Sequence, residues 1–150
     1  MIKMMCLSVL CTAIYAMEPN IEARVLEIVH RTAQGIDSSF VAHDKKAMAF
    51  SSGLREIEPM LADKEGLALV VKRIQIVVGN EKTEERELLF AAYVLGCITE
   101  DAQSIELVID AAVDARRSDL LHVKLKEMLV AEKVLTKAQR ERLKGIANPE

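Results

Sequence analysis

Apolar side chains recur every three or four residues along most of this 150-residue chain. The clearest stripe runs from Leu67 to Val78 and places Val70, Ile74 and Val77 on one side of a helix. Its β-branched residues also favour strands by propensity, but the helical period and the length of the segment outweigh that preference. We therefore predict an all-α protein of short helices in antiparallel pairs, either a helical bundle or a small α-solenoid.

Helix caps and breakers divide the chain into seven or eight predicted helices. Gly35 ends the first, and Asp37 to Ser39 can cap a second. Pro59 predicts that a helix ends near Ile57 or restarts at Met60. No charge-only linker separates these helices, so residues 17–150 are predicted to form a single all-helical domain. The second helix is expected to carry Phe40, Val41, Ala47 and Met48 in its apolar stripe, and later helices are expected to begin near Asp63, Thr83, Thr99 or Asp101, Ser118, and Thr136.

Residues 1–16 have the anatomy of a secretory signal peptide. Lys3 supplies a short positive region, and the segment from Met4 to Ala16 carries no charge. Ala16 is a small residue suited to the cleavage site, and a cut after Ala13 is the alternative. The segment is shorter than the roughly 20 apolar residues that a bilayer span needs. The sequence thus predicts an exported protein, periplasmic or secreted, with no membrane span after the signal is removed.

Signal removal also determines the expected cysteine chemistry. It leaves Cys97 as the only thiol, so no intramolecular disulfide is expected. The apolar run from Leu88 to Ile98 is typical of a central buried helix. A buried and inert Cys97 is therefore predicted.

Charge is unevenly distributed along the chain. Residues 17–114 carry 10 basic and 18 acidic side chains, whereas residues 115–150 carry 9 basic and 5 acidic ones. This asymmetry leaves homo-oligomerisation end to end, or contact with an anionic surface, open as alternatives, but we interpret it as a set of solvated helix faces. The basic part has no aromatic side chain on which a base could stack, so nucleic acid is not an expected partner.

Three sets of apolar residues recur along the chain at spacings of 37 or 38 residues, which is typical of helix-pair repeats. Residues 91–114 contain Ala91-Ala92-Tyr93-Val94-Leu95-Gly96, then Ile98, then Ile105 to Asp114, and this order resembles the HEAT-like repeat pattern. The resemblance implies a solenoid in which successive helices line a surface for another protein. The recurring sets are Leu61, Ile98 and Leu135; Leu67, Ile105 and Leu143; and Val70, Val108 and Ile146.

A second resemblance lies near the C-terminus. The segment Leu135-Thr136-Lys137-Ala138-Gln139-Arg140 is similar to the Leu-Thr-x-x-Gln motif of small periplasmic helical chaperones of the Spy and CpxP type. That resemblance implies an exported all-α dimer that cradles unfolded clients. Thr136 and Gln139 also form a capping-box pair, which explains the same residues by the start of a helix.

No combination of polar residues forms a recognisable catalytic or metal-binding motif. His30, His43 and His122 are not spaced to share one helical metal face. Glu27 and His30 make one Glu-x-x-His, but a di-iron bundle needs two, and this pair is predicted to face solvent. Cys97 has no neighbouring His or Lys to activate it. We therefore nominate no catalytic, cofactor-binding or metal-binding residue and no cofactor.

These observations favour an exported, non-catalytic helical protein that mediates protein–protein interaction as a scaffold or adaptor. Its expected partner is another protein of unspecified identity. The alternative is a Spy- or CpxP-like periplasmic chaperone or envelope-stress protein, which the motif at Leu135 to Gln139 suggests.

Overall fold

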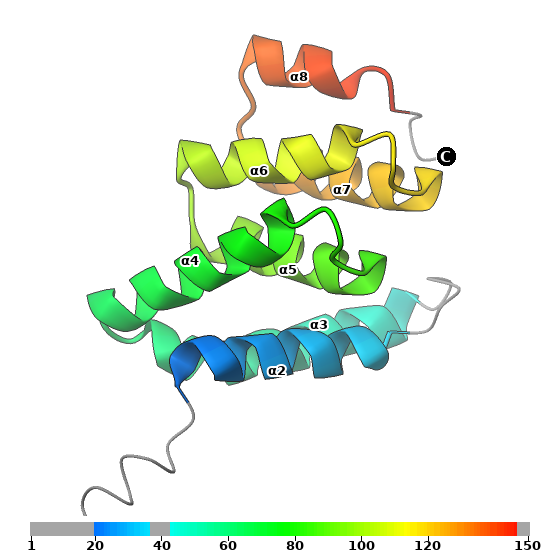
Figure 1. Ribbon diagram of the computed structural model, residues 1–150. Helices are drawn as coiled ribbons and strands as arrows, with labels where there is room; N and C mark the ends of the chain where they lie inside the picture. The colour runs from blue at the N-terminus through cyan, green and yellow to red at the C-terminus, as the bar shows by residue number, and fades with distance from the viewer. Residues whose placement is uncertain (1–19, 37–42, 147–150) are drawn as a thin grey trace, which may run out of the picture.

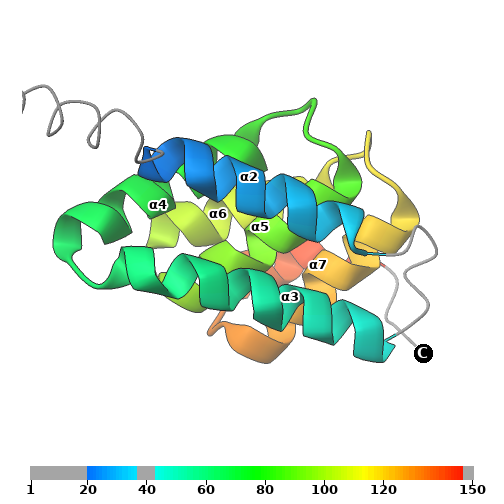
Figure 2. The same cartoon turned by 90° about the horizontal axis from the view of Figure 1, so that it is seen from below.

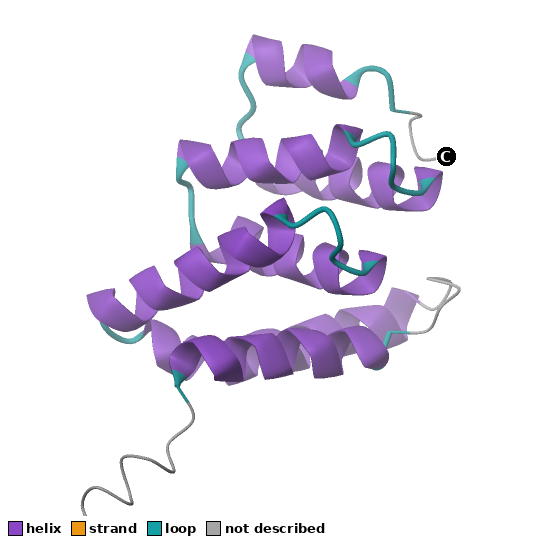
Figure 3. Cartoon of the chain, viewed as in Figure 1, coloured by secondary structure: helices purple, strands orange, loops and turns teal. Residues whose placement is uncertain are grey.

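The computed structural model of the chain describes residues 20–36 and 43–146, and for α3 it describes side chains from Met48 onward. Every regular element in these ranges is a helix, which confirms the all-α prediction (Figure 3). The predicted signal peptide, Met1 to Ala16, and the predicted cap at Asp37 to Ser39 lie outside the described residues. The helices are α2 (Ile21–Gln34), α3 (His43–Ile57), the 3-10 helix η1 (Glu58–Leu61), α4 (Lys64–Gly79), α5 (Glu85–Ile98), α6 (Ala102–Val113), α7 (Asp119–Glu132) and α8 (Lys137–Leu143).

The helices form two layers that are stacked in tiers. In the view of Figure 1, α2, α4, α6 and α8 follow one another in the front layer, and α3, α5 and α7 lie behind them. Three tiers are pairs, α2 with α3, α4 with α5, and α6 with α7, whereas α8 packs on α6 at the top. Figure 2 shows α2 and α3 side by side at the bottom of the stack. This arrangement of packed helix pairs is compatible with a helical repeat.

Local capping chemistry sets most helix starts. The Asp63 carboxylate accepts a hydrogen bond from the Gly66 amide (2.6 Å), and the Ser118 hydroxyl accepts one from the Leu121 amide (3.2 Å). Thr136 and Gln139 make the reciprocal pair of bonds that defines a capping box. Asp101, rather than Thr99, caps α6. Pro59 lies in η1, directly after α3 ends at Ile57, as its missing amide proton requires.

The central helix of the core is α5. All residues from Leu88 to Leu95 are buried except Tyr93, which is half-buried. Phe90 is fully buried, and its ring centroid lies 5.5 Å from that of Phe50 in α3. The Phe50 ring in turn lies 5.0 Å from that of Tyr93, so aromatic contacts join the first tier to the second.

Two burial predictions are wrong. Met48 is 72% exposed, because the inward stripe of α3 is formed by Phe50, Leu54 and Ile57 instead. Cys97 is exposed rather than buried. It follows Tyr93 by four residues and so shares the least buried side of α5. The apolar run therefore predicted that this helix is central. It did not predict which side of the last helical turn is exposed.

The repeat spacing changes at the top of the stack. The interval from the N-cap Asp63 to the N-cap Asp101 is three residues longer than the interval from Asp101 to the N-cap Thr136. The seventh residue after each cap is buried, and these residues are Val70, Val108 and Leu143. Leu143, not Ile146, is therefore the residue of α8 that corresponds to Val108 of α6. Residues 91–114 run from α5 into α6 and so cross from one tier to the next.

Candidate functional site

An open groove lies where the C-terminal ends of α4 and α6 meet the loops that follow them. Its volume is about 380 Å³, which lies within the range of pockets that hold small ligands or single side chains of a partner. We call it the α4–α6 groove. Its lining residues are Val78, Gly79, Asn80, Glu81, Leu107, Asp110, Ala111, Asp114, Arg116 and Arg117.

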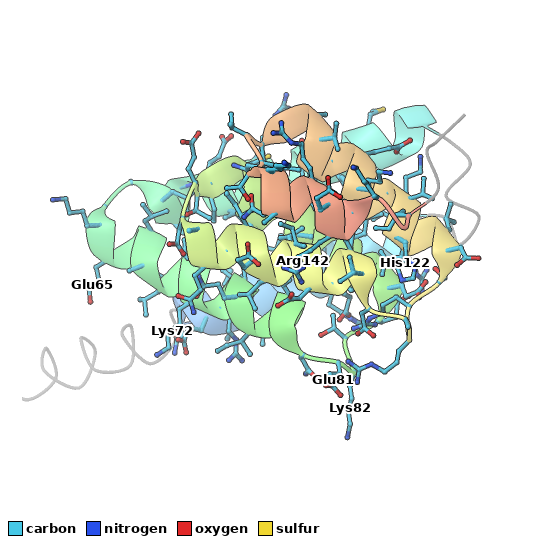
Figure 4. All side chains as sticks on the ribbon, turned by 90° about the horizontal axis from the view of Figure 1, so that it is seen from above. Glu65, Lys72, Glu81, Lys82, His122 and Arg142 are labelled. Atoms are coloured by element: carbon cyan, nitrogen blue, oxygen red, sulfur yellow. The ribbon has the colours of Figure 1, made fainter. Side chains whose placement is uncertain are left out.

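The α4–α6 groove has an apolar floor and a charged rim. Val78 and Ala111 are buried and Leu107 is half-buried, so the floor presents little hydrogen-bonding capacity. The side chain of Glu81 projects from the loop after α4, and Figure 4 shows it at the lower edge of the molecule, beside Lys82. Asp110 is exposed on α6. A bound group would therefore meet apolar side chains together with the carboxylates of Glu81, Asp110 and Asp114 and the guanidinium groups of Arg116 and Arg117.

Hydrogen bonds between successive loops hold the groove open. The Arg117 guanidinium donates to the carbonyl oxygens of Asn80 (3.2 Å) and Thr83, both in the loop of the previous tier. The Ser118 amide and hydroxyl donate to the Glu85 carboxylate at 2.8 and 2.7 Å. These bonds join the loop after α6 to the loop after α4, so the groove is built by residues of two tiers.

Arg116 organises the charges on the rim. Its guanidinium pairs with Glu81 and donates to both carboxylate oxygens of Asp114, at 2.9 and 3.0 Å. These side-chain bonds, together with the Arg116 amide, hold the pKa of Asp114 below its ordinary value of 3.8, although partial burial works in the opposite direction. On the other side of the groove, Arg142 pairs with Asp110 and with Glu106 (2.7 Å).

The lowered pKa of Asp114 predicts a loss of stability in acid. A carboxylate with a lower pKa in the folded state stabilises the fold above its ordinary value of 3.8 and loses that contribution as the pH falls through the folded value. Asp114→Asn and Arg116→Gln should therefore each flatten the decline in the free energy of unfolding between about pH 5 and pH 2. Urea unfolding at several pH values measures this slope. Variants whose stability declines as steeply as that of the unaltered protein would contradict the prediction.

A second opening, between α5, α6 and α7, offers little room. It is lined mainly by apolar residues, including Leu95, Val108 and Leu129, and its volume is about 10 Å³. That space is sufficient for about one water molecule. The α4–α6 groove is therefore the better candidate for binding a partner.

His30 and His122 lie in different tiers, in α2 and α7. His30 is exposed, as predicted, but its Nδ1 lies 2.6 Å from Glu87 of α5, and its other ring nitrogen lies 2.9 Å from the amide nitrogen of Gln34. Glu27 instead pairs with Arg31, one turn later. His122 is partly buried, and its Nε2 lies 2.6 Å from the Asp114 carbonyl oxygen. The side chain of His43 lies outside the described residues.

Cys97 has a raised pKa. Although Cys97 is exposed, neighbouring side chains remove part of its hydration; this desolvation is the main cause that raises its pKa, and nearby Glu132 adds to it, while Tyr93 and Lys133 act in the opposite direction. Lys133 comes from the loop after α7 and is distant in sequence, which is why sequence reasoning missed it. The thiol therefore stays protonated to higher pH than an isolated cysteine. Among the described residues, no three His, Cys, Asp or Glu side chains are placed to hold a metal ion.

The chaperone-like motif serves as the start of α8. Leu135 is buried, the Gln139 amide donates to the Thr136 hydroxyl (3.2 Å), and the Thr136 amide donates to the Gln139 side chain (2.9 Å). Gln139 also donates to Glu106 of α6 (2.7 Å). The polar groups of the motif therefore form hydrogen bonds with other groups of the same chain.

Comparison with known proteins found no relative of this chain. No protein-family model matches the chain, and no curated protein or solved structure matches it. Over the described ranges, none of the helices combines the length and the apolar character that crossing a bilayer requires.

Sequence analysis did not find the residues of the groove rim, because Glu81, Asp110 and Arg116 belong to different helices and loops. The one available signal was the interval between Asn80 and Arg117, which matches the spacing of the repeat.

Proposed function

We propose that this chain is an exported, non-catalytic adaptor with a small HEAT-like solenoid fold, and that it binds a segment of another protein in the α4–α6 groove. The observation that carries the proposal is the groove itself, an open site of about 380 Å³ at the seam between two tiers. Solenoids commonly bind partners along surfaces built by successive repeats. Export is supported by the signal-peptide pattern of Met1 to Ala16.

The chemistry of the groove favours a segment with a basic side chain next to apolar ones. Val78, Leu107 and Ala111 offer the apolar floor. The C-terminal ends of α4 and α6 both face the groove, and a helix C-terminus carries a partial negative charge. Among the lining residues, three carboxylates (Glu81, Asp110 and Asp114) outnumber two guanidinium groups (Arg116 and Arg117), so the groove carries a net charge of −1. A lysine or arginine of the partner would therefore be attracted into the groove, with its neighbours on the floor.

Filling the groove with a side chain tests this function. Peptides that bind the purified protein can be selected from a displayed random library, and the selected peptides should be enriched in Lys or Arg beside apolar residues. Gly79→Leu places a side chain into the groove, where a Cβ has only ordinary contact with Leu107, at 3.7 Å. This variant should weaken the selected peptides at least about tenfold in fluorescence anisotropy, which corresponds to about 1.4 kcal/mol.

Gly145→Leu is the matched control, because a Cβ at Gly145 meets nothing within 4 Å and the residue lies outside the groove. It should bind the peptides as the unaltered protein does. Equal binding by Gly79→Leu and the unaltered protein would refute the groove as the site. Suppression of client aggregation without any peptide selectivity would instead favour the chaperone alternative. A mature N-terminus at Met17 or Ile14 in mass spectra would support export, and an intact N-terminus would contradict it.

A further inference from the structure

Each carboxylate that lines the α4–α6 groove is already paired with a guanidinium group of this chain. Arg116 pairs with Glu81 and with Asp114. Arg142 of α8 pairs with Asp110. A basic side chain of a partner therefore has to replace one of these arginines before it can bond to a carboxylate of the groove. The arginine that is held least firmly is the one that a partner can replace.

Two of the arginines at the groove are fixed by other contacts. Arg117 is half-buried, and its guanidinium donates to the carbonyl oxygens of Asn80 and Thr83 in the previous tier. Its removal would break the link between two loops. Arg142 is next to Leu143, which is buried, so the packing of α8 on α6 fixes its position.

Arg116 is held more loosely than these two. It lies in the loop between α6 and α7, and its side chain is 60% exposed. Within the described ranges, its guanidinium bonds only to the carboxylates of Glu81 and Asp114, and the Glu81 side chain is 68% exposed. Ion pairs at such exposure contribute little to stability, because water screens them and both side chains lose rotamer freedom. Arg116 can therefore leave its position at a small cost.

The position that Arg116 occupies has the shape of a guanidinium site. Its Nε and one terminal nitrogen donate to the two carboxylate oxygens of Asp114, at 2.9 and 3.0 Å, and the other terminal nitrogen pairs with Glu81. All three nitrogen atoms of one planar group thus meet two carboxylates, which we call the carboxylate cradle. An ammonium group is a compact charge and cannot make the same set of parallel bonds.

We propose that the groove recognises an arginine of its partner, which takes the place of Arg116 in the carboxylate cradle, so that Arg116 is an internal competitor that sets the affinity and the arginine specificity of the site. This recognition rests on the proposed function, since it specifies the group that the groove binds. Exchange of one guanidinium for another leaves the number of ion pairs at the cradle unchanged. The net gain on binding therefore comes from the partner's apolar side chains on the groove floor.

Removal of the internal competitor tests the proposal. The probe is an arginine-containing peptide from the displayed library, together with the same peptide in which lysine replaces the arginine. Arg116→Gln should bind the arginine peptide at least about threefold more tightly than the unaltered protein in fluorescence anisotropy, because the cradle is then free. The lysine peptide should gain much less. Far-UV circular dichroism checks that the variant is folded.

Lys82→Gln is the matched control for the loss of one positive charge. Lys82 is exposed, follows Glu81 in the same loop and does not line the groove (Figure 4). This variant should bind the arginine peptide within about twofold of the unaltered protein, because solvent screens an exposed charge. An equal gain by Lys82→Gln and Arg116→Gln would show a general effect of charge and would overturn the proposal.

The Nε–H resonance of Arg116 in ¹⁵N-labelled protein reports on the cradle directly. It should shift when the protein is saturated with the arginine peptide, since Arg116 loses its bonds to Asp114. The corresponding resonance of Arg86, whose Nε donates to Glu84 at 3.0 Å outside the groove, should stay in place. An unmoved Arg116 resonance at saturation would overturn the exchange, as would a selection that enriches peptides without arginine.

Gly79→Leu separates this inference from the function on which it rests. If Gly79→Leu weakens the arginine peptide while Arg116→Gln does not strengthen it, the groove remains the binding site and the role of Arg116 is refuted. If Gly79→Leu binds the peptide as the unaltered protein does, the groove is refuted as the site, and the proposed exchange at the cradle is refuted with it.

Discussion

Phe90→Ala is expected to lower the free energy of unfolding by about 3–5 kcal/mol, the usual cost of removing a fully buried phenylalanine. The ring lies at the centre of α5 and contacts Phe50 of α3, so its loss leaves a cavity between the first and second tiers. Total stabilities of domains of this size are about 5–15 kcal/mol. The variant should therefore unfold at a much lower urea concentration than the unaltered protein.

Leu120→Ala provides the comparison for this substitution. Leu120 is a large apolar residue of α7 that lies exposed, so its truncation should change stability by no more than about 0.5 kcal/mol. A loss of less than about 1 kcal/mol for Phe90→Ala would mean that the contact between α3 and α5 contributes little in solution.

Gly66→Ala should destabilise the protein by about 2 kcal/mol, although alanine favours helices by about 1 kcal/mol over glycine. A Cβ at Gly66 would lie 2.1 Å from the backbone carbonyl oxygen of Met60, which cannot turn away as a side chain does. Relief of that clash must move the start of α4 away from η1. The movement also disturbs the bond from the Gly66 amide to the Asp63 cap.

Gly79→Ala, at the other end of α4, is the matched control. There the nearest atom to a new Cβ is Cδ2 of Leu107, at an ordinary contact distance of 3.7 Å. Its stability should be unchanged or raised by up to about 1 kcal/mol. Urea unfolding of the two variants side by side tests the difference, and equal stabilities would show that η1 does not constrain the start of α4.

Features that depend on neighbours in sequence were predictable from the sequence. The caps at Asp63, Ser118 and Thr136 each depend on a side chain and an amide three residues later, and a single sequence contains both. Pro59 ends α3 because proline lacks the backbone amide proton that a helix interior needs. The continuous apolar run from Leu88 to Ile98 likewise predicted that α5 is the central helix.

Features that depend on another tier were not predictable in this way. Whether Cys97 is buried depends on which side of α5 the helices of the next tier cover. The α4–α6 groove depends on the offset between two helices and on Arg117, which reaches carbonyl groups 34 and 37 residues earlier. The recurring apolar sets suggested a repeat, but they could not reveal that the interval before α8 is three residues shorter than the preceding one.

In the described part of the chain, each tier packs mainly on the tiers next to it. Cooperativity in such an array passes from neighbour to neighbour, and the terminal element frays most readily. Here that element is α8, a helix of seven residues held mainly by Leu143 and by the bonds of Gln139 and Arg142 to α6. Amide hydrogen exchange should therefore be faster in α8 than in the buried helices of the tiers below it.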